Sequence, residues 1–413
     1  MNTLAAGGAL IVFACLTGLA ARFCTAAAIF WMLLIEATPE FWLSPDPAIH
    51  EDILALMKAA GIALALILAI RETPKPDRYN PSFAFVFMFI AGLAHGLYQN
   101  LTLTDSIRSL LGSIAPFAFG FVKLPRDWCR AVIRTTIYGP LWAVTAGVVI
   151  QLAGLHTLYD DTAGAFRLTG GGEAPFLGGF ALIAIYAGLM EFLQTASRRE
   201  FWLIAANFLI LILTGARAPL ALAVFLSAAA FLLPNPNFTA RGKIILLAAA
   251  GALASLAFMF ISSLGFVRII SLAKSGDATN LSNRGLTWPY FQAAIHASPW
   301  VGWGLGAGKV VIPVTGPLST LLGTNAAHNE FLRIGAEGGV IGVALLAFLM
   351  AAWAWKNTQT MPTPQRWLLR LIFIAFAIHS WTDNTLIATT SSILFICVSA
   401  IFATAPEPPK PPA

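Results

Sequence analysis

The residue best suited to chemistry in this chain is a histidine in a polar segment. His328 lies in NAAHNEFLRIGAEGGVIG, a stretch whose charged side chains interrupt an apolar sequence. Thr324 or Asn325 can cap a short helix that ends at the Gly-Gly pair, and this cap places His328 in the first helical turn. The helix dipole disfavours a protonated ring there, which predicts a lowered pKa and a neutral imidazole that can accept a proton. The alternative is a histidine that only hydrogen-bonds a neighbouring loop.

Two arginines are candidates for binding an anion. Arg217 lies in LTGARAP between two apolar stretches, and Arg284 lies in LSNRGLTW. An arginine at the outer boundary of a membrane runs against the usual distribution of cations and needs an anionic partner. Two guanidinium groups can hold a diphosphate by bidentate hydrogen bonds, whereas structural ion pairs are the alternative.

Further polar residues are candidates for the same cavity, namely Arg108, Arg167, Asn329 and Asp383. No metal site is expected, because the carboxylates of YDDT and of the first outer connection have no third type of ligand nearby and are typical of solvated loops. No cofactor is expected either. The glycines of GWGLGAG, residues 302–308, have no β-α-β context and predict a tight turn rather than a nucleotide-binding loop.

The elements that must position these residues are membrane-spanning helices. The chain has 413 residues, of which 58% are hydrophobic and 11% charged, whereas soluble domains carry about a quarter charged residues. Apolar stretches long enough to cross about 30 Å of hydrocarbon recur along nearly the whole chain, which predicts an all-α polytopic membrane protein. The candidate spans are residues 51–70, 82–98, 105–121, 130–152, 176–196, 201–216, 218–233, 244–264, 336–355, 368–383 and 386–404.

Residues 4–38 add one span, or two if they turn at Arg22, so we expect about 12 transmembrane helices, 12 or 13. Lysines and arginines gather in alternate connections, which places those connections in the cytoplasm by the positive-inside rule. The net charge of +6 is spread between the spans, so no nucleic acid is expected as a partner. The expected division is helices over 1–264, a long outer loop over 265–335 with the catalytic elements, helices over 336–404 and a proline-rich cytoplasmic tail over 405–413.

Four segments, in this order and spacing, resemble the O-antigen ligase and polymerase superfamily of bacterial envelope enzymes. They are T-G-A-R between two spans, S-N-R-G-L-T-W, G-W-G-L-G-A-G, and A-H-N-E-F-L-R-I-G-A-E-G-G-V-I-G opening a span. The resemblance covers about residues 165–390, and the histidine segment is its most specific part. This sequence has A-R-A-P where relatives often place a hydroxyl residue before the arginine.

The resemblance implies a membrane C-type glycosyltransferase with a large, partly helical periplasmic loop and an active site on the periplasmic face of the bacterial inner membrane. It implies inverting, metal-independent transfer of a glycan from undecaprenyl pyrophosphate to a sugar hydroxyl of the lipid A core. By the same resemblance His328 corresponds to the catalytic histidine, and Arg217 and Arg284 correspond to the diphosphate-binding arginines. Contacts with other proteins of lipopolysaccharide assembly are left open.

Three other activities remain as alternatives at this point. An O-antigen or surface polysaccharide polymerase would use undecaprenyl pyrophosphate for both substrates, and motifs separate it poorly from a ligase. A ligase that glycosylates proteins usually has a longer C-terminal region. A transporter or flippase for an anionic lipid-linked substrate would use the arginines only for binding, but it predicts internal repeats, which the sequence does not display convincingly.

Overall fold

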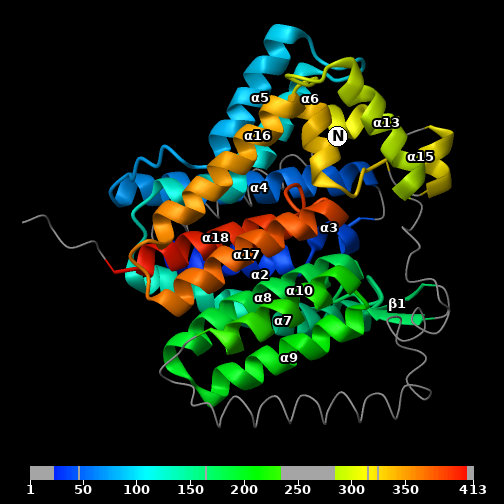
Figure 1. Ribbon diagram of the computed structural model, residues 1–413. Helices are drawn as coiled ribbons and strands as arrows, with labels where there is room; N and C mark the ends of the chain where they lie inside the picture. Colours follow the sequence, from blue (N-terminus) through cyan, green and yellow to red (C-terminus); the bar gives the residue numbers. More distant parts are fainter. Residues whose placement is uncertain are drawn as a thin grey trace, which may run out of the picture.

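The computed structural model describes residues 23–44, 47–162, 165–233, 284–313, 316–322 and 325–406. These residues form a bundle of helices with a two-stranded hairpin at one end (Figure 1). The first half contains α2 (Cys24–Glu36), α3 (Pro39–Trp42), α4 (Pro47–Arg71), α5 (Ser82–His95), α6 (Leu103–Ile114), the 3₁₀ helix η1 (Ala115–Phe121), α7 (Arg126–Leu152), β1 (Tyr159–Thr162) and β2 (Ala165–Leu168). The second half contains α8 (Ala174–Thr195), α9 (Arg198–Thr214), α10 (Arg217–Leu232), α13 (Arg284–Ala297), α14 (Ala307–Val310), α15 (Pro317–Leu322), α16 (Glu330–Thr358), α17 (Thr363–Thr382) and α18 (Thr389–Thr404).

Several helices have the length and composition of membrane spans. Four are long and apolar enough to cross a membrane, namely Ile49–Arg71, Arg126–Leu152, Ala174–Thr195 and Glu330–Thr358. Shorter apolar helices are Cys24–Glu36, Ser82–His95, Arg217–Leu232 and Thr389–Thr404. The chain is therefore a helical membrane protein, as expected, but a total of 12 or 13 spans is not confirmed. The expected span over 244–264 and the start of the chain, residues 1–22, lie outside the described residues.

The stretch expected to form one span over 105–121 is built from two elements. α6 ends at Ile114, and a 3₁₀ helix continues to Phe121. Pro116 lies at the start of this 3₁₀ helix, where it has no N–H group to donate to an α-helical hydrogen bond. Average hydropathy does not detect this break, because every residue from Ala115 to Phe121 is apolar or glycine.

Three of the basic connections meet at one end of the bundle. Pro74 forms an isolated bridge with Val122, and the Nζ atom of Lys75 donates to Oδ1 of Asn357 at 3.3 Å. Lys356 lies 3.8 Å from Asp77 in the same region. Basic residues occur in every second connection between the expected spans. The meeting of three such connections at one end therefore agrees with helices that cross a membrane back and forth. α16 begins after His328 and ends near Lys356, so His328 lies at the opposite end from this basic cluster.

α9 and α10 are joined by a tight turn, as the sequence predicts. Gly215 ends α9 with φ +67°, a left-handed conformation that glycine adopts without a side-chain clash. Arg217 is the first residue of α10. The β1–β2 hairpin, which was not expected in an all-α fold, lies beside this turn, and Asp160 faces Arg167 across it.

α16 is broken at Gly339, where φ is +58° and ψ is −165°. The glycine turn that precedes α14 packs against this break through backbone hydrogen bonds. The N–H groups of Trp303 and Gly304 each donate at 2.9 Å, to the carbonyls of Ala336 and Glu337 respectively. In the other direction, the N–H of Val340 donates to the carbonyl of Pro299 at 2.8 Å. These bonds satisfy groups that a broken helix would leave unpaired.

Candidate functional site

His328 lies just before α16 rather than inside its first turn. Asn329 is the N-cap, and its Oδ1 atom accepts hydrogen bonds from the N–H groups of Phe331 at 2.9 Å and Leu332 at 3.2 Å. The expected cap at Thr324 or Asn325 is therefore wrong, and the argument that placed the ring in the first turn does not apply. His328 has φ +48°, an uncommon backbone conformation for a residue with a side chain. The side chain of Asn329 is buried and serves the cap.

The ring of His328 faces a carboxylate from the far end of the sequence. Nδ1 of His328 lies 3.5 Å from Oδ1 of Asp383, and about a third of each side chain is exposed. Partial burial opposes ionisation of Asp383, but the hydrogen bond with His328 and the charge of His379 outweigh it, so the pKa of Asp383 lies below its ordinary value. A carboxylate that accepts a hydrogen bond from Nδ1–H leaves Nε2 as the basic nitrogen.

Glu330 holds together the two connections that carry this pair. Its Oε1 atom accepts hydrogen bonds from the backbone N–H groups of Leu386 at 2.7 Å and Ile387 at 3.3 Å. Glu330 is the second residue after His328, and Leu386 is the third after Asp383. The position of the imidazole relative to the carboxylate therefore depends on a side chain that is almost fully buried.

A buried ion triad extends this support to the glycine turn. Nε of Arg333 donates to Oε2 of Glu330 at 2.5 Å, and its Nη1 donates to Oε2 of Glu337 at 2.6 Å. Oε1 of Glu337 in turn lies 3.3 Å from the N–H donors of Gly306 and Gly308. All three charged side chains are buried, so each carboxylate depends on these donors for compensation.

The segment before His328 rests on a small helical platform. The indole N–H of Trp288, on α13, donates to the carbonyl of Ala327 at 3.0 Å. The side-chain amide of Asn325 donates to the carbonyl of Lys309, on α14, at 2.8 Å. Ala327 also belongs to an apolar cluster whose largest member is Phe291. These contacts hold Ala327, the residue before His328, against α13, in addition to the support that Glu330 provides.

Arg167 is tied to the turn that carries Arg217. Its Nε atom donates to the carbonyl of Thr214 at 2.9 Å, and Arg217 follows three residues later at the start of α10. The structure thus brings together two arginines that are 50 positions apart in the sequence. Arg284 begins α13, but its side chain lies outside the described part of the chain.

Glu173 interacts with both Arg167 and His328. It occupies the N-cap position of α8 without a capping hydrogen bond from its side chain, and its carboxyl group lies within electrostatic reach of both partners. Burial raises the pKa of Glu173 above its ordinary value, although the positive charge of Arg167 opposes this shift. An acidic side chain is thus within electrostatic reach of both groups, and sequence analysis had not selected it.

Helix packing places these groups at the same end of the bundle. Gly178 of α8 lies against Ala216, just before Arg217, and Gly179 lies against Thr390, near the start of α18. A small pocket between α8, α17 and α18 is lined by His379 and Thr385, on either side of Asp383. The N-terminal part of α8 therefore adjoins both the arginine turn and the connection that carries Asp383.

Glu40 and Asp52, two acids from the first third of the chain, each lie near a cation, Lys58 and Arg108 respectively. Glu40, on α3, is buried, and this burial is the main reason why its pKa is raised to about 7; a backbone hydrogen bond and the charge of Lys58 oppose the shift, and the charge of Glu173 adds to it. Lys58 donates its Nζ proton to the carbonyl of Ile387 at 2.6 Å. Arg108, expected as a cavity residue, lies 3.8 Å from Asp52 in a half-exposed ion pair.

This arrangement can move a proton at the end of the bundle that also carries two arginines. The His328 and Asp383 pair offers one basic nitrogen, and Arg167 with the Arg217 turn supplies positive charge at the same end of the bundle. The sequence pointed to these four residues individually. It missed Glu173 and the triad, although the spacing of Glu330, Arg333 and Glu337, by three and four residues on one helix, is a readable signal for ion pairs.

Comparison with known proteins adds a family match. A family model described as O-antigen ligase matches residues 201–347. The matched region contains the turn before α10, the platform of α13 to α15, and α16 as far as Ala347. It includes Arg217, Arg284 and His328, and it excludes Arg167 and Asp383. A search of curated proteins finds no match to the chain.

Proposed function

The chain belongs to the O-antigen ligase superfamily, and on that premise we propose that it ligates a glycan from undecaprenyl pyrophosphate to a sugar hydroxyl of the lipid A core. The superfamily carries out ligase and polymerase reactions of a glycosyltransferase type on lipid-linked glycans. The choice of the lipid A core as acceptor, the periplasmic orientation in the bacterial inner membrane and the independence from metal ions are parts of the proposal.

The observation that carries the proposal is the pairing of His328 with Asp383. In the proposed step the acceptor hydroxyl attacks the anomeric carbon, and its proton moves to Nε2 of His328 as the new glycosidic bond forms. Asp383 holds the ring in orientation and stabilises the positive charge that the imidazole gains. A base positioned in this way typically contributes about 10²- to 10⁴-fold to the rate.

The arginines would act on the leaving group. As the bond between the anomeric carbon and the pyrophosphate oxygen breaks, negative charge grows on undecaprenyl pyrophosphate. Arg217 and Arg284 are proposed to bind that diphosphate, with Arg167 beside the Arg217 turn through its contact with Thr214. Preorganised charges of this kind stabilise the transition state more than the ground state. Attack opposite the leaving group inverts the anomeric centre.

A reconstitution tests the reaction. The full-length protein in detergent is mixed with undecaprenyl-pyrophosphate glycan and lipid A core, without nucleotide and with a metal chelator. We expect ligated lipopolysaccharide, detected as a mass increase of the core, and its loss in His328→Ala. His296→Ala is the matched control, because His296 is an exposed histidine on the platform helix α13 and should leave the activity unchanged.

Other products would identify the competing activities. Elongated donor chains without ligated core would show a polymerase. Movement of the lipid-linked glycan across vesicle membranes without a covalent product would show a transporter and reject both enzymatic functions. Ligation that requires an added divalent metal would contradict the metal-independent mechanism, and ligation that persists in His328→Ala would remove this residue from the proposed chemistry.

A further inference from the structure

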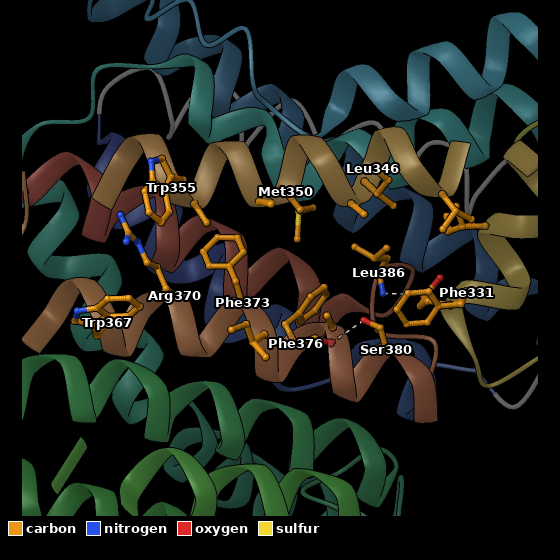
Figure 2. Close-up of a pocket in the computed structure, with 18 residues that line it drawn as sticks. Phe331, Leu346, Met350, Trp355, Trp367, Arg370, Phe373, Phe376, Ser380 and Leu386 are labelled. Carbon is orange, nitrogen blue, oxygen red and sulfur yellow. Dashed lines mark hydrogen bonds between the residues drawn. The ribbon is translucent and has the colours of Figure 1, made fainter. Parts of the chain in front are cut away.

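A groove runs between α16 and α17, from Glu330 and Leu386 at the candidate site to Trp355 and Arg370 at the far ends of the segments that line it. It has a volume of about 430 Å³, within the range of about 300 to 1,000 Å³ typical of ligand sites. Figure 2 shows Leu346 and Met350 of α16 facing Phe373 and Phe376 of α17 across it. Its walls are almost wholly apolar, so they suit a hydrocarbon chain rather than a sugar.

The two ends of the groove differ in chemistry. At one end Phe331 and Ser380 line it, close in sequence to His328 and Asp383. At the other end, on the left of Figure 2, lie Trp355, Trp367 and Arg370. α16 crosses from the site to the basic cluster, so this second end belongs to the opposite membrane boundary. Tryptophan and arginine at such a boundary are typical of contact with lipid headgroups.

Arg370 is held in place by three contacts. Its guanidinium carbon lies 3.8 Å from the ring centroid of Trp355 and 5.6 Å from that of Trp367. Its Nε atom donates to Oγ1 of Thr358 at 2.9 Å. The aromatic rings and the hydroxyl fix the plane of the guanidinium while leaving its two Nη groups for an external acceptor.

No carboxylate among the described residues pairs with Arg370, and the charged group that acts on it is Arg366, another cation. Arg366 itself donates from Nε and Nη2 to the carbonyl of Met361, at 3.3 and 3.0 Å. The Arg370 end of the groove therefore carries positive charge that no carboxylate of the described residues pairs with. An anion supplied by the membrane would complement it.

We propose that the groove between α16 and α17 is a binding site for an anionic membrane phospholipid. Its phosphate contacts Arg370, and one acyl chain lies between α16 and α17, reaching toward Phe331. The headgroup belongs to the leaflet opposite the candidate site, which separates this lipid from a donor whose diphosphate would lie near His328. Lipid binding here depends on the apolar walls and on Arg370, and it does not require the proposed reaction.

Native mass spectrometry of the full-length protein tests this site. The protein is purified in a mild detergent and incubated with phosphatidylglycerol or with phosphatidylcholine of the same acyl composition. We expect one tightly bound phosphatidylglycerol per chain and weaker binding of phosphatidylcholine. Arg370→Gln should weaken phosphatidylglycerol binding about tenfold and abolish the preference, since one charge-assisted hydrogen bond is lost.

Matched variants distinguish recognition of the lipid headgroup from binding of the acyl chain. Arg199→Gln removes an arginine that also lies over an aromatic ring, that of Tyr138 at 5.5 Å, and should keep the preference. Ala347→Trp should fill the groove and reduce binding of both lipids, whereas Ala344→Trp, outside the lining, should not. The melting temperature of each variant is measured first, and lipid binding is compared only for variants that melt at the same temperature as the wild type. Misfolding is then not mistaken for lost binding.

Three outcomes would overturn the proposal. Equal binding of the two lipids by the wild type would show that no anionic headgroup is recognised. Wild-type binding of phosphatidylglycerol by Arg370→Gln would remove this residue from the site. Binding of undecaprenyl phosphate in place of phosphatidylglycerol, blocked by Ala347→Trp, would assign the groove to the donor lipid instead.

Discussion

Nδ1 of His328 lies 3.5 Å from Oδ1 of Asp383, although 55 positions separate the two residues in the sequence. The pair is assembled from the segment just before α16 and the connection after α17, and Glu330 holds these two segments together through the backbone N–H of Leu386. A base at His328 would therefore depend on tertiary structure in two ways, through the charge of Asp383 and through the position set by Glu330.

The first prediction concerns the charge of Asp383. Asp383→Asn should lower kcat by about 100-fold or more and leave KM nearly unchanged, because an amide no longer stabilises a protonated imidazole. The measurement is initial-rate kinetics of ligation in the reconstituted system. Asp161→Asn changes an exposed carboxylate on the β1–β2 hairpin and should retain wild-type rates. Normal kcat in Asp383→Asn would mean that His328 works without this partner.

The second prediction concerns the arginines. Arg217→Ala and Arg284→Ala should each lower turnover by about 10²- to 10³-fold, as expected for loss of one group that stabilises a developing anion. Both variants should fold normally, since each residue begins a helix rather than filling its core. Single-turnover assays with excess enzyme measure the chemical step directly. Arg108→Ala is the control, because Arg108 pairs with Asp52 in a half-exposed ion pair. A wild-type rate for either arginine variant would exclude that residue from the site.

The third prediction concerns the buried triad. Arg333→Met should destabilise the protein by about 3 to 5 kcal/mol, because Glu330 and Glu337 would remain buried without a cation. Combining Arg333→Met with Glu330→Gln and Glu337→Gln should recover much of that loss. Thermal unfolding in detergent measures both variants.

A surface pair supplies the comparison for the triad. Arg130→Met breaks the pair with Asp127, whose side chains are mostly exposed, and should cost less than about 1 kcal/mol. If Arg333→Met were no more harmful than Arg130→Met, the triad would not be a stabilising element.

Local patterns in the sequence were enough to predict several helices and one turn. The apolar runs of α7 and α8 carry their own signal, and Gly215 marks the end of α9. The break between α6 and η1 was missed because hydropathy averages do not distinguish an α-helix from a 3₁₀ helix. The pairing of His328 with Asp383 was missed for another reason: it depends on how two distant connections pack. Such contacts have no local signature.

The fourth prediction concerns the break in α16. Gly339→Ala should lower the melting temperature and the activity, because its backbone conformation is strained for any residue with a Cβ atom and that atom would overlap the backbone of Trp300. Gly112→Ala, in the helical interior of α6, is the control. A Cβ atom at Gly112 meets nothing closer than 3.5 Å, so alanine should be neutral or stabilising by up to about 1 kcal/mol. Equal melting temperatures for the two variants would show that the break tolerates a side chain.

The fifth prediction is a pH dependence of stability that comes from Glu40. Burial raises the pKa of this carboxyl from 4.5 to about 7 in the folded protein. Between these values the folded state binds more protons than the unfolded state, so Glu40 makes stability fall as pH rises from about 4.5 to about 7 and adds no further change above. Glu40→Gln cannot ionise. Its melting temperature should therefore exceed that of the wild type at pH 8, and the difference should shrink toward pH 4.5. A difference that is constant over this range would show that Glu40 titrates normally.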